Sequence, residues 1–230
     1  MTNSLKGHIA LFFAQIVYAL NYSIAKDLMP DFISPVALVF LRIVGACALF
    51  WLLSVFYRVQ VVEKKDLFKM AWLACFGVVI NQLFFIYGLS LTKPINSAII
   101  MISNPVIVFV FTLLLLKERI TFFKFSGLVL AIAGATTLLL FRGNFQFGSE
   151  TLRGDFLTLI NSTSWAIFVV LVKPVMLRYN TVTAMRWMFL FGTIYMIPIG
   201  LKDALSIQWA EFTPHAVFAV CFVVIATTFF

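Results

Sequence analysis

Long apolar stretches, each about 20 residues in length and so able to cross a bilayer, dominate the hydrophobic pattern of this chain. Apolar and polar residues do not alternate strictly within them, so the stretches predict helices rather than the strands of a barrel. We expect eight spans, at residues 8–27, 35–57, 68–91, 95–116, 121–141, 155–176, 182–201 and 214–230. The pattern predicts an all-α polytopic membrane protein.

The pattern also repeats within the chain. Each residue of one set returns 147 positions later: Gly7, Tyr18, Ala19 and Lys26 correspond to Gly154, Trp165, Ala166 and Lys173. Because five spans lie between the two copies, the second copy must enter the bilayer from the opposite side, which is typical of secondary transporters. We therefore expect a first repeat at 1–141 (helices 1–5), a linker at 142–153 and a second, incomplete repeat at 154–230 (helices 6–8).

A second set of matches predicts that the chain is incomplete at its C-terminal end. At a displacement of 146 positions, Trp72, Cys75, Phe76, Asn81 and Phe84 correspond to Phe218, Cys221, Phe222, Thr227 and Phe230. The second copy thus stops within its third helix, while the first continues to residue 141. We expect a chain truncated within the eighth helix of a ten-helix protein built from two inverted sets of five.

Composition and charge agree with a membrane location. The chain is 63% hydrophobic and 11% charged, far from the balance of soluble proteins. Its net charge of +8 comes from Lys and Arg scattered between apolar runs, which argues against nucleic acid as a partner and leaves the lipid bilayer. A two-to-one excess of these residues on the side of the N-terminus places that end in the cytoplasm. We expect a multi-pass protein of the plasma membrane, the inner membrane of a bacterium.

The three cysteines all fall inside apolar stretches and show no CxxC spacing. We expect no disulfide, no bound metal and no cofactor. The two histidines lie near helix ends, and the chain has neither a GxSxG nor an HExxH motif, so we expect no enzyme.

An ordered set of short motifs resembles the EamA-type branch of the drug/metabolite transporter superfamily. It comprises Pro35 with Leu41 and Arg42, the run from Tyr87 to Thr92, Ala98–Ile100, Pro105, Leu116–Glu118, Gly127 and Gly134, then Gly154–Asp155, Ser164–Ala166, Lys173 and Pro198. The resemblance covers the whole chain. It implies ten helices with both termini in the cytoplasm, two inverted five-helix repeats, and export of small metabolites or amino acids.

A solute site in such a bundle is expected near the membrane midplane, where few polar side chains occur. The candidates that bind the small-molecule solute are the polar and aromatic residues of the spans: Gln15, Tyr18, Asn21, Asn81, Gln82, Tyr87, Asn104, Asn161, Trp165 and Thr227. Tyr18 and Trp165 correspond under the repeat and are expected to line the cavity as a pair of aromatic walls, with packing or a membrane-interface position as the alternative. For the amides, hydrogen bonding between helices competes with solute binding.

Four further residues are candidates for gating or structure. Pro105 removes one helical hydrogen bond and predicts a kink, either at a gate or as a static bend. Arg42 and Arg186 lie within spans, and their long side chains are expected to reach the membrane surface. Arg42 is the stronger candidate for contact with an anionic group, and Glu118 is expected to be a loop or packing residue.

All nine carboxylates fall at span ends or in connections, whereas proton or sodium relays place them within the membrane. We therefore expect facilitated diffusion or exchange by alternating access, with a membrane channel as the alternative and a seven-helix receptor as a weaker one. Gly127 and Gly134 form a small-residue stripe. It fits either contacts within the bundle or a homodimer.

Overall fold

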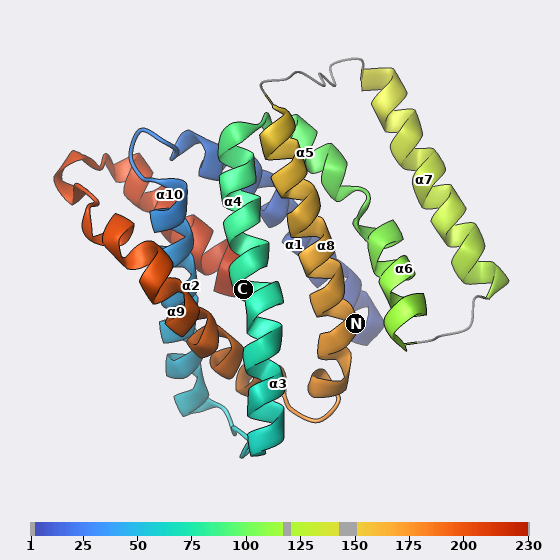
Figure 1. Ribbon diagram of the computed structural model, residues 1–230, viewed down its shortest axis with the longest axis horizontal. Helices are drawn as coiled ribbons and strands as arrows, with labels where there is room; N and C mark the ends of the chain where they lie inside the picture. The colour runs from blue at the N-terminus through green and yellow to red at the C-terminus, as the bar shows by residue number, and fades with distance from the viewer. Residues whose placement is uncertain (1–2, 117–120, 143–150, 230) are drawn as a thin grey trace.

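The computed structural model describes residues 3–116, 121–142 and 151–229, and all regular structure in these ranges is helical (Figure 1). In chain order the elements are α1 (Asn3–Asp27), α2 (Pro35–Phe56), α3 (Lys64–Ala74), η1 (Cys75–Ile80), α4 (Asn81–Leu91), α5 (Pro94–Met101), α6 (Asn104–Leu116), α7 (Phe122–Arg142), α8 (Leu152–Met176), α9 (Thr181–Leu205), η2 (Trp209–Glu211), α10 (Pro214–Val224) and η3 (Ile225–Phe229). The turns η1 and η3 are π-helical, and η2 is a 3₁₀ turn.

Each of the eight predicted spans is helical in the residues that the structure describes. Six segments are long and apolar enough to cross a membrane: Gly7–Asp27, Pro35–Phe56, Lys64–Leu91, Pro94–Leu116, Leu152–Met176 and Thr181–Leu205. Within the described residues, the fifth and eighth predicted spans hold shorter apolar helical stretches, Phe125–Gly134 and Pro214–Phe229. The chain is an all-α polytopic membrane protein.

Local sequence fixes where several of these helices begin. Ser34 precedes α2, and its Oγ accepts a hydrogen bond from the backbone N–H of Ala37 at 3.2 Å, while Pro35 fills the first position. Asn180 precedes α9 and accepts the N–H of Thr183 through Oδ1 at 2.8 Å. These caps satisfy backbone donors that the first helical turn leaves unpaired.

Two pairs of helices form the centre of the bundle (Figure 1). α2 packs along α9, where the rings of Phe50 and Phe189 stack with centroids 5.3 Å apart. α4 packs along α8, and α1 lies against α10 and η3. Since every one of these contacts joins segments far apart in the sequence, the two halves of the chain share one core.

Two glycines allow α4 and α8 to approach closely. A Cβ atom added at Gly154 would lie 2.7 Å from the carbonyl oxygen of Gly88, and one added at Gly88 would lie 3.1 Å from the carbonyl oxygen of Gly154. Both distances are shorter than an ordinary contact, so only the absence of side chains permits this crossing.

The small-residue stripe predicted on the fifth span has a different setting. α7 stands at the edge of the bundle beside α6 (Figure 1). A Cβ atom at Gly127 or Gly134 would meet no atom within 4 Å. Among the described residues, these glycines therefore do not mediate packing within the bundle.

Candidate functional site

A buried polar contact joins α1 to η3. Asn21 is 2% exposed, and its Oδ1 accepts a hydrogen bond from the Thr227 hydroxyl at 3.3 Å. The same hydroxyl lies 2.7 Å from the carbonyl oxygen of Val223, so its single proton is shared between two acceptors. Both Asn21 and Thr227 were predicted as solute-binding candidates, and the structure brings them together across 206 positions of sequence.

Arg42 lies beside this contact and also reaches η3. Its Nε donates to the hydroxyl of Thr228 at 2.9 Å, and that hydroxyl in turn lies 2.9 Å from the carbonyl oxygen of Val223. The Arg42 side chain is buried, and its Nη1 has no hydrogen-bond partner in the structure. The expectation that it reaches the membrane surface is wrong, because the bond to Thr228 directs the guanidinium inward.

The π-helical turn η1 and the start of α4 present backbone carbonyls to α8. Ser164 donates to the carbonyl oxygen of Phe76 at 2.6 Å, and the Asn161 amide nitrogen donates to that of Asn81 at 2.7 Å. A π-helical turn shifts the regular backbone pairing, which exposes carbonyls of this kind. The side-chain oxygens of Asn161 and Gln82 are buried without a hydrogen-bond partner.

The fourth predicted span is broken just before Pro105. Ile102 and Ser103 form a turn between α5 and α6, as the missing N–H of proline predicts. Asn104 donates weakly to the sulfur of Met101 at 3.7 Å, and its side-chain oxygen is buried without a partner. The structure has a break between α5 and α6 where a kink was predicted, and a gating role stays a prediction.

Four of the predicted solute contacts lie outside this buried set. Tyr18 and Trp165 are 49% and 36% exposed, and Gln15 and Tyr87 are also exposed. The Trp165 ring packs at a tilt against Phe168, with centroids 5.5 Å apart. The structure does not join the two aromatic walls around a common space, and their role stays a prediction.

Arg186 has a different environment from Arg42. Its guanidinium carbon lies 5.1 Å from the ring centroid of Trp51 and 5.7 Å from that of Trp187. Such distances are typical of cation–π contacts, which fits an anchoring role. Glu118 lies outside the described residues.

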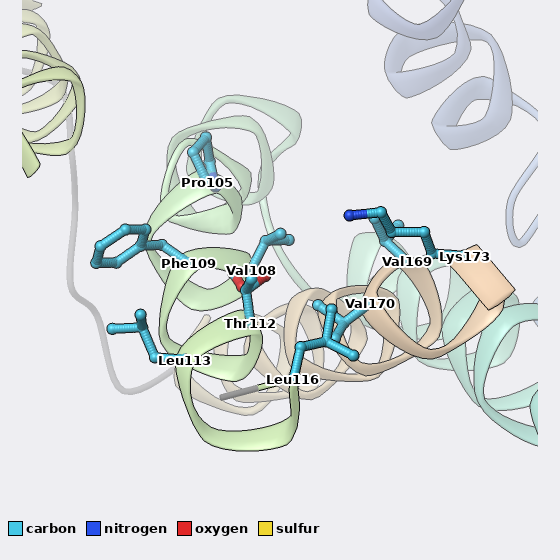
Figure 2. Close-up of a pocket in the computed structure, with 9 residues that line it drawn as sticks. All are labelled: Pro105, Val108, Phe109, Thr112, Leu113, Leu116, Val169, Val170 and Lys173. Atoms are coloured by element: carbon cyan, nitrogen blue, oxygen red, sulfur yellow. The ribbon is translucent and has the colours of Figure 1, made fainter. Parts of the chain in front are cut away.

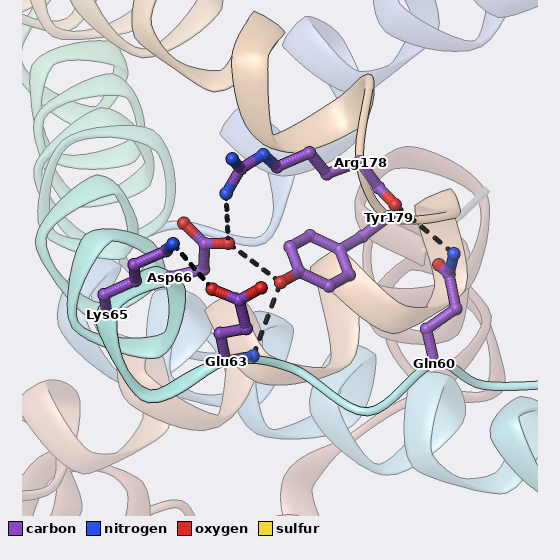
Figure 3. Close-up of polar contacts among 6 residues, drawn as sticks. All are labelled: Gln60, Glu63, Lys65, Asp66, Arg178 and Tyr179. Atoms are coloured by element: carbon purple, nitrogen blue, oxygen red, sulfur yellow. Dashed lines mark hydrogen bonds and ion pairs between the residues drawn. The ribbon is translucent and has the colours of Figure 1, made fainter.

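A second polar cluster, which the sequence did not reveal, joins the start of α3 to the connection between α8 and α9 (Figure 3). Asp66 Oδ2 accepts from Arg178 Nη1 at 2.9 Å and from the Tyr179 hydroxyl at 2.8 Å. The hydrogen bond to Asp66 raises the pKa of both Arg178 and Tyr179. Gln60 extends the cluster by donating to the Arg178 carbonyl oxygen at 3.3 Å.

The sequence carried only a weak signal for this cluster. Asp66 stands in the first turn of a helix, where an acidic residue is favoured by the helix dipole alone. Arg178 and Tyr179 follow Pro174 in a connection that the span pattern places on the same side of the membrane. Their pairing across 112 and 113 positions required the tertiary structure.

Polar contacts also join the connection between α4 and α5 to other helices, at the end of the bundle where α8 begins. The Lys26 ammonium donates to the carbonyl oxygens of Leu89, Ser90 and Thr92 at 2.7–3.0 Å. The Thr92 hydroxyl donates to Asp155 Oδ1 at 2.6 Å, and both side chains are buried. Contacts between the two halves of the chain therefore occur at the Asp66 cluster and here.

A pocket of about 430 Å³ lies between α6 and α8, away from the buried polar residues (Figure 2). It is lined by Pro105, Val108, Phe109, Thr112, Leu113, Leu116, Val169, Val170 and Lys173. Apolar side chains dominate it, so it offers little to orient a polar solute.

The buried polar residues of α1, α2, α4, α8 and η3 supply hydrogen-bond donors and acceptors rather than metal ligands. Within the described ranges, no group of three or more His, Cys, Asp or Glu is placed to hold a metal ion. Unpaired polar atoms inside a membrane protein are costly unless a solute, water or neighbour meets them. This arrangement is suited to binding a small polar solute.

Two protein families match the chain, and together they span most of it. Residues 5–140 match the EamA-like transporter family. Residues 91–230 match solute carrier family 35.

The relatives of this chain are named as transporters or as WAT1-related proteins. An uncharacterized transporter of Archaeoglobus fulgidus is 27% identical over 98% of this chain and 77% of its own length. The uncharacterized transporter YetK of Bacillus subtilis is 25% identical over 64% of this chain and 45% of its own length. A WAT1-related protein of Arabidopsis thaliana is 28% identical over 84% and 56%, respectively.

The fold is similar to that of another protein whose crystal structure is known. Its TM-score is 0.67 at 18% identity, with 95% of this chain and 73% of that chain covered. At this identity the likeness shows the fold alone.

Proposed function

Since this chain belongs to the EamA-like transporter family, and thus is a membrane transporter, we propose that it moves small metabolites or amino acids across the plasma (inner) membrane by alternating access. In this proposal it is a secondary exporter with a cytoplasmic N-terminus. The solute binds at the buried polar residues where the two halves of the chain meet.

The pattern of helix contacts supports an inverted repeat with the boundaries 1–141 and 154–230. Under the repeat, α1 corresponds to α8, and the third span corresponds to α10 with η3. The first helix of each half packs against the third span of the other: α1 on α10 and η3, and α8 on α4. The second helices, α2 and α9, pack against each other. A twofold axis in the membrane plane would produce this pairing.

The observation that carries the proposed site is the set of buried polar atoms without partners on α4, α8 and α2, helices that take part in contacts between the two halves of the chain. The Gln82 oxygen and Arg42 Nη1 belong to the first half, and the Asn161 oxygen belongs to the second. Thr228, also of the second half, accepts the hydrogen bond from Arg42 Nε. A static packing interface would be more stable with these groups paired or replaced by apolar ones. Their retention supports a site that a solute completes.

Polar contacts at the two ends of the bundle support the proposal of alternating access. The Asp66–Arg178–Tyr179 cluster joins the two halves at one end, and the Thr92–Asp155 hydrogen bond joins them at the other. In the proposed cycle, opening one end of the bundle would break the polar contacts at that end while the contacts at the other end remain. Transport would be uncoupled or by exchange, since the described carboxylates lie at helix ends or in connections.

The test is transport by the complete protein in proteoliposomes, with a panel of metabolites and amino acids, with and without a proton gradient. Gln82→Leu is the diagnostic variant, because Gln82 makes no hydrogen bond through its buried side-chain oxygen. We expect at least about a ten-fold loss of transport, equivalent to roughly 1.4 kcal/mol, with unchanged or higher melting temperature. Gln208→Leu, at an exposed position between α9 and η2, is the matched control.

Transport by Gln82→Leu at the wild-type rate would remove Gln82 from the site. Continuous ion conductance without saturable uptake would favour the channel alternative. Dependence of transport on the proton gradient would reject the uncoupled mechanism.

A further inference from the structure

Arg42 is a buried cation whose charge the described part of the protein does not balance. Its side chain is 5% exposed, and it lies seven residues after the start of α2, about 10 Å along the helix axis at 1.5 Å per residue. Nε donates to a neutral hydroxyl, that of Thr228, and Nη1 has no partner. No carboxylate among the described residues forms an ion pair with it.

The energetic consequence follows from the cost of burying charge. Removing a guanidinium from water costs several kcal/mol of hydration free energy. This cost is offset only when an opposite charge or a full set of hydrogen bonds surrounds the group. Arg186, the other arginine within the predicted spans, also has a buried nitrogen without a hydrogen-bond partner, Nε, but its guanidinium contacts two tryptophan rings. Arg42 has no ring contact of this kind in the described structure, so it is the cation that a ligand would complete.

The surroundings of Arg42 hold it in place for such a ligand. The Thr228 hydroxyl donates a hydrogen bond to the Val223 carbonyl oxygen at 2.9 Å, so a lone pair of its oxygen faces Arg42 Nε and accepts from it. This fixes one edge of the guanidinium, while Nη1 is buried without a hydrogen-bond partner. Arginine presents a planar fork of donors, which matches the two oxygens of a carboxylate.

We propose that Arg42 binds the acidic group of the transported solute, so that the substrate class is small organic anions carrying a carboxylate, amino acids among them. The inference rests on the proposed function and adds the chemistry of the ligand. Thr228 acts as a positioning residue, because it touches the guanidinium rather than the solute. The solute's negative charge replaces the counter-ion that the described chain does not supply.

The test compares acids with their neutral amides on the purified protein in detergent. Benzoate, phenylacetate, butyrate and phenylalanine are each paired with the primary amide, and binding is measured as the rise in melting temperature and the change in tryptophan fluorescence. At least one carboxylate should bind about ten-fold or more tightly than its amide, the factor expected for loss of one charge-assisted hydrogen bond. This comparison uses the wild-type protein and requires no variant to fold.

Variants then assign the preference to Arg42. Arg42→Gln should lose the preference for acids, and Arg42→Lys should keep part of it. Arg186→Gln, the matched loss of one intramembrane charge, should keep it in full. Thr228→Val should weaken binding of the acid while its preference over the amide persists, because the positive charge remains.

Equal binding of acids and amides, no binding of any carboxylate, or an unchanged preference in Arg42→Gln would each overturn the inference. Its failure is distinguishable from failure of the proposed function. Saturable transport of neutral solutes that does not depend on Arg42 would reject the anion site and keep the transporter. Anion binding without transport of any bound acid would reject the transport proposal and keep the anion site.

Discussion

Replacing Gly154 by alanine tests the close crossing of α4 and α8. The added Cβ would lie 2.7 Å from the Gly88 carbonyl oxygen and 2.8 Å from the carbonyl carbon of Leu91. Both of these atoms belong to the backbone, so no side-chain rotation can relieve the overlap. The helices must separate by about 0.7 Å before the contact to Gly88 reaches an ordinary 3.4 Å.

The magnitude follows from three terms. Overpacking of this kind costs about 1–3 kcal/mol. The same movement stretches the Thr92–Asp155 hydrogen bond from 2.6 Å to about 3.3 Å, beyond the usual O–H···O range, at a cost of about 1 kcal/mol. The higher helix propensity of alanine returns about 1 kcal/mol. We expect a net loss of about 1–3 kcal/mol in the free energy of unfolding.

The assay is unfolding of the purified protein by SDS in mixed micelles, followed by tryptophan fluorescence, with the melting temperature in detergent as a second measure. Gly127→Ala is the control, since its Cβ meets no atom within 4 Å, and it should match or exceed wild type. Gly88→Ala should fall between the two, because its nearest contact is 3.1 Å. Stability of Gly154→Ala equal to that of Gly127→Ala would refute the reasoning.

Three further predictions concern the Asp66 cluster and the exposed tryptophans. Asp66→Asn should lower the melting temperature by removing the ion pair with Arg178. Adding Arg178→Gln to this variant should lower the melting temperature little further. Full additivity of the two single effects in the double variant would contradict the pairing. The raised pKa of Tyr179 means that the fold favours the neutral phenol. This stabilisation is complete below the usual tyrosine pKa, about 10, and is lost as pH rises through the raised pKa. When the melting temperature is measured against pH, Tyr179→Phe should remove this alkaline loss of stability. An alkaline profile identical to that of wild type would count against the prediction. Trp165→Ala should reduce transport in proteoliposomes more than Trp209→Ala, a control in the 3₁₀ turn, and equal effects would remove Trp165 from the site.

Sequence reasoning located several members of the buried polar set but not their contacts. Asn21, Gln82, Asn161 and Thr227 were identifiable because amides and hydroxyls are rare in apolar spans. A distortion of the helix at Pro105 was predictable because proline cannot supply the helical N–H, although the structure has a break there rather than a kink. Spacing also pointed to Tyr18, whose side chain is 49% exposed, whereas Asn21 on a neighbouring face of α1 is buried. Helical periodicity defines faces without saying which one is covered.

The sequence by itself determined the class of the protein, because the composition and length of apolar runs leave a helical membrane bundle as the only arrangement that pairs the backbone in lipid. It also determined where the helices lie, through proline and capping residues at their starts. The tertiary structure alone decided which polar groups meet. Thr228 reaches Arg42 across 186 positions, and Tyr179 reaches Asp66 across 113. Such contacts depend on how helices cross and rotate, which the pattern along one helix does not encode.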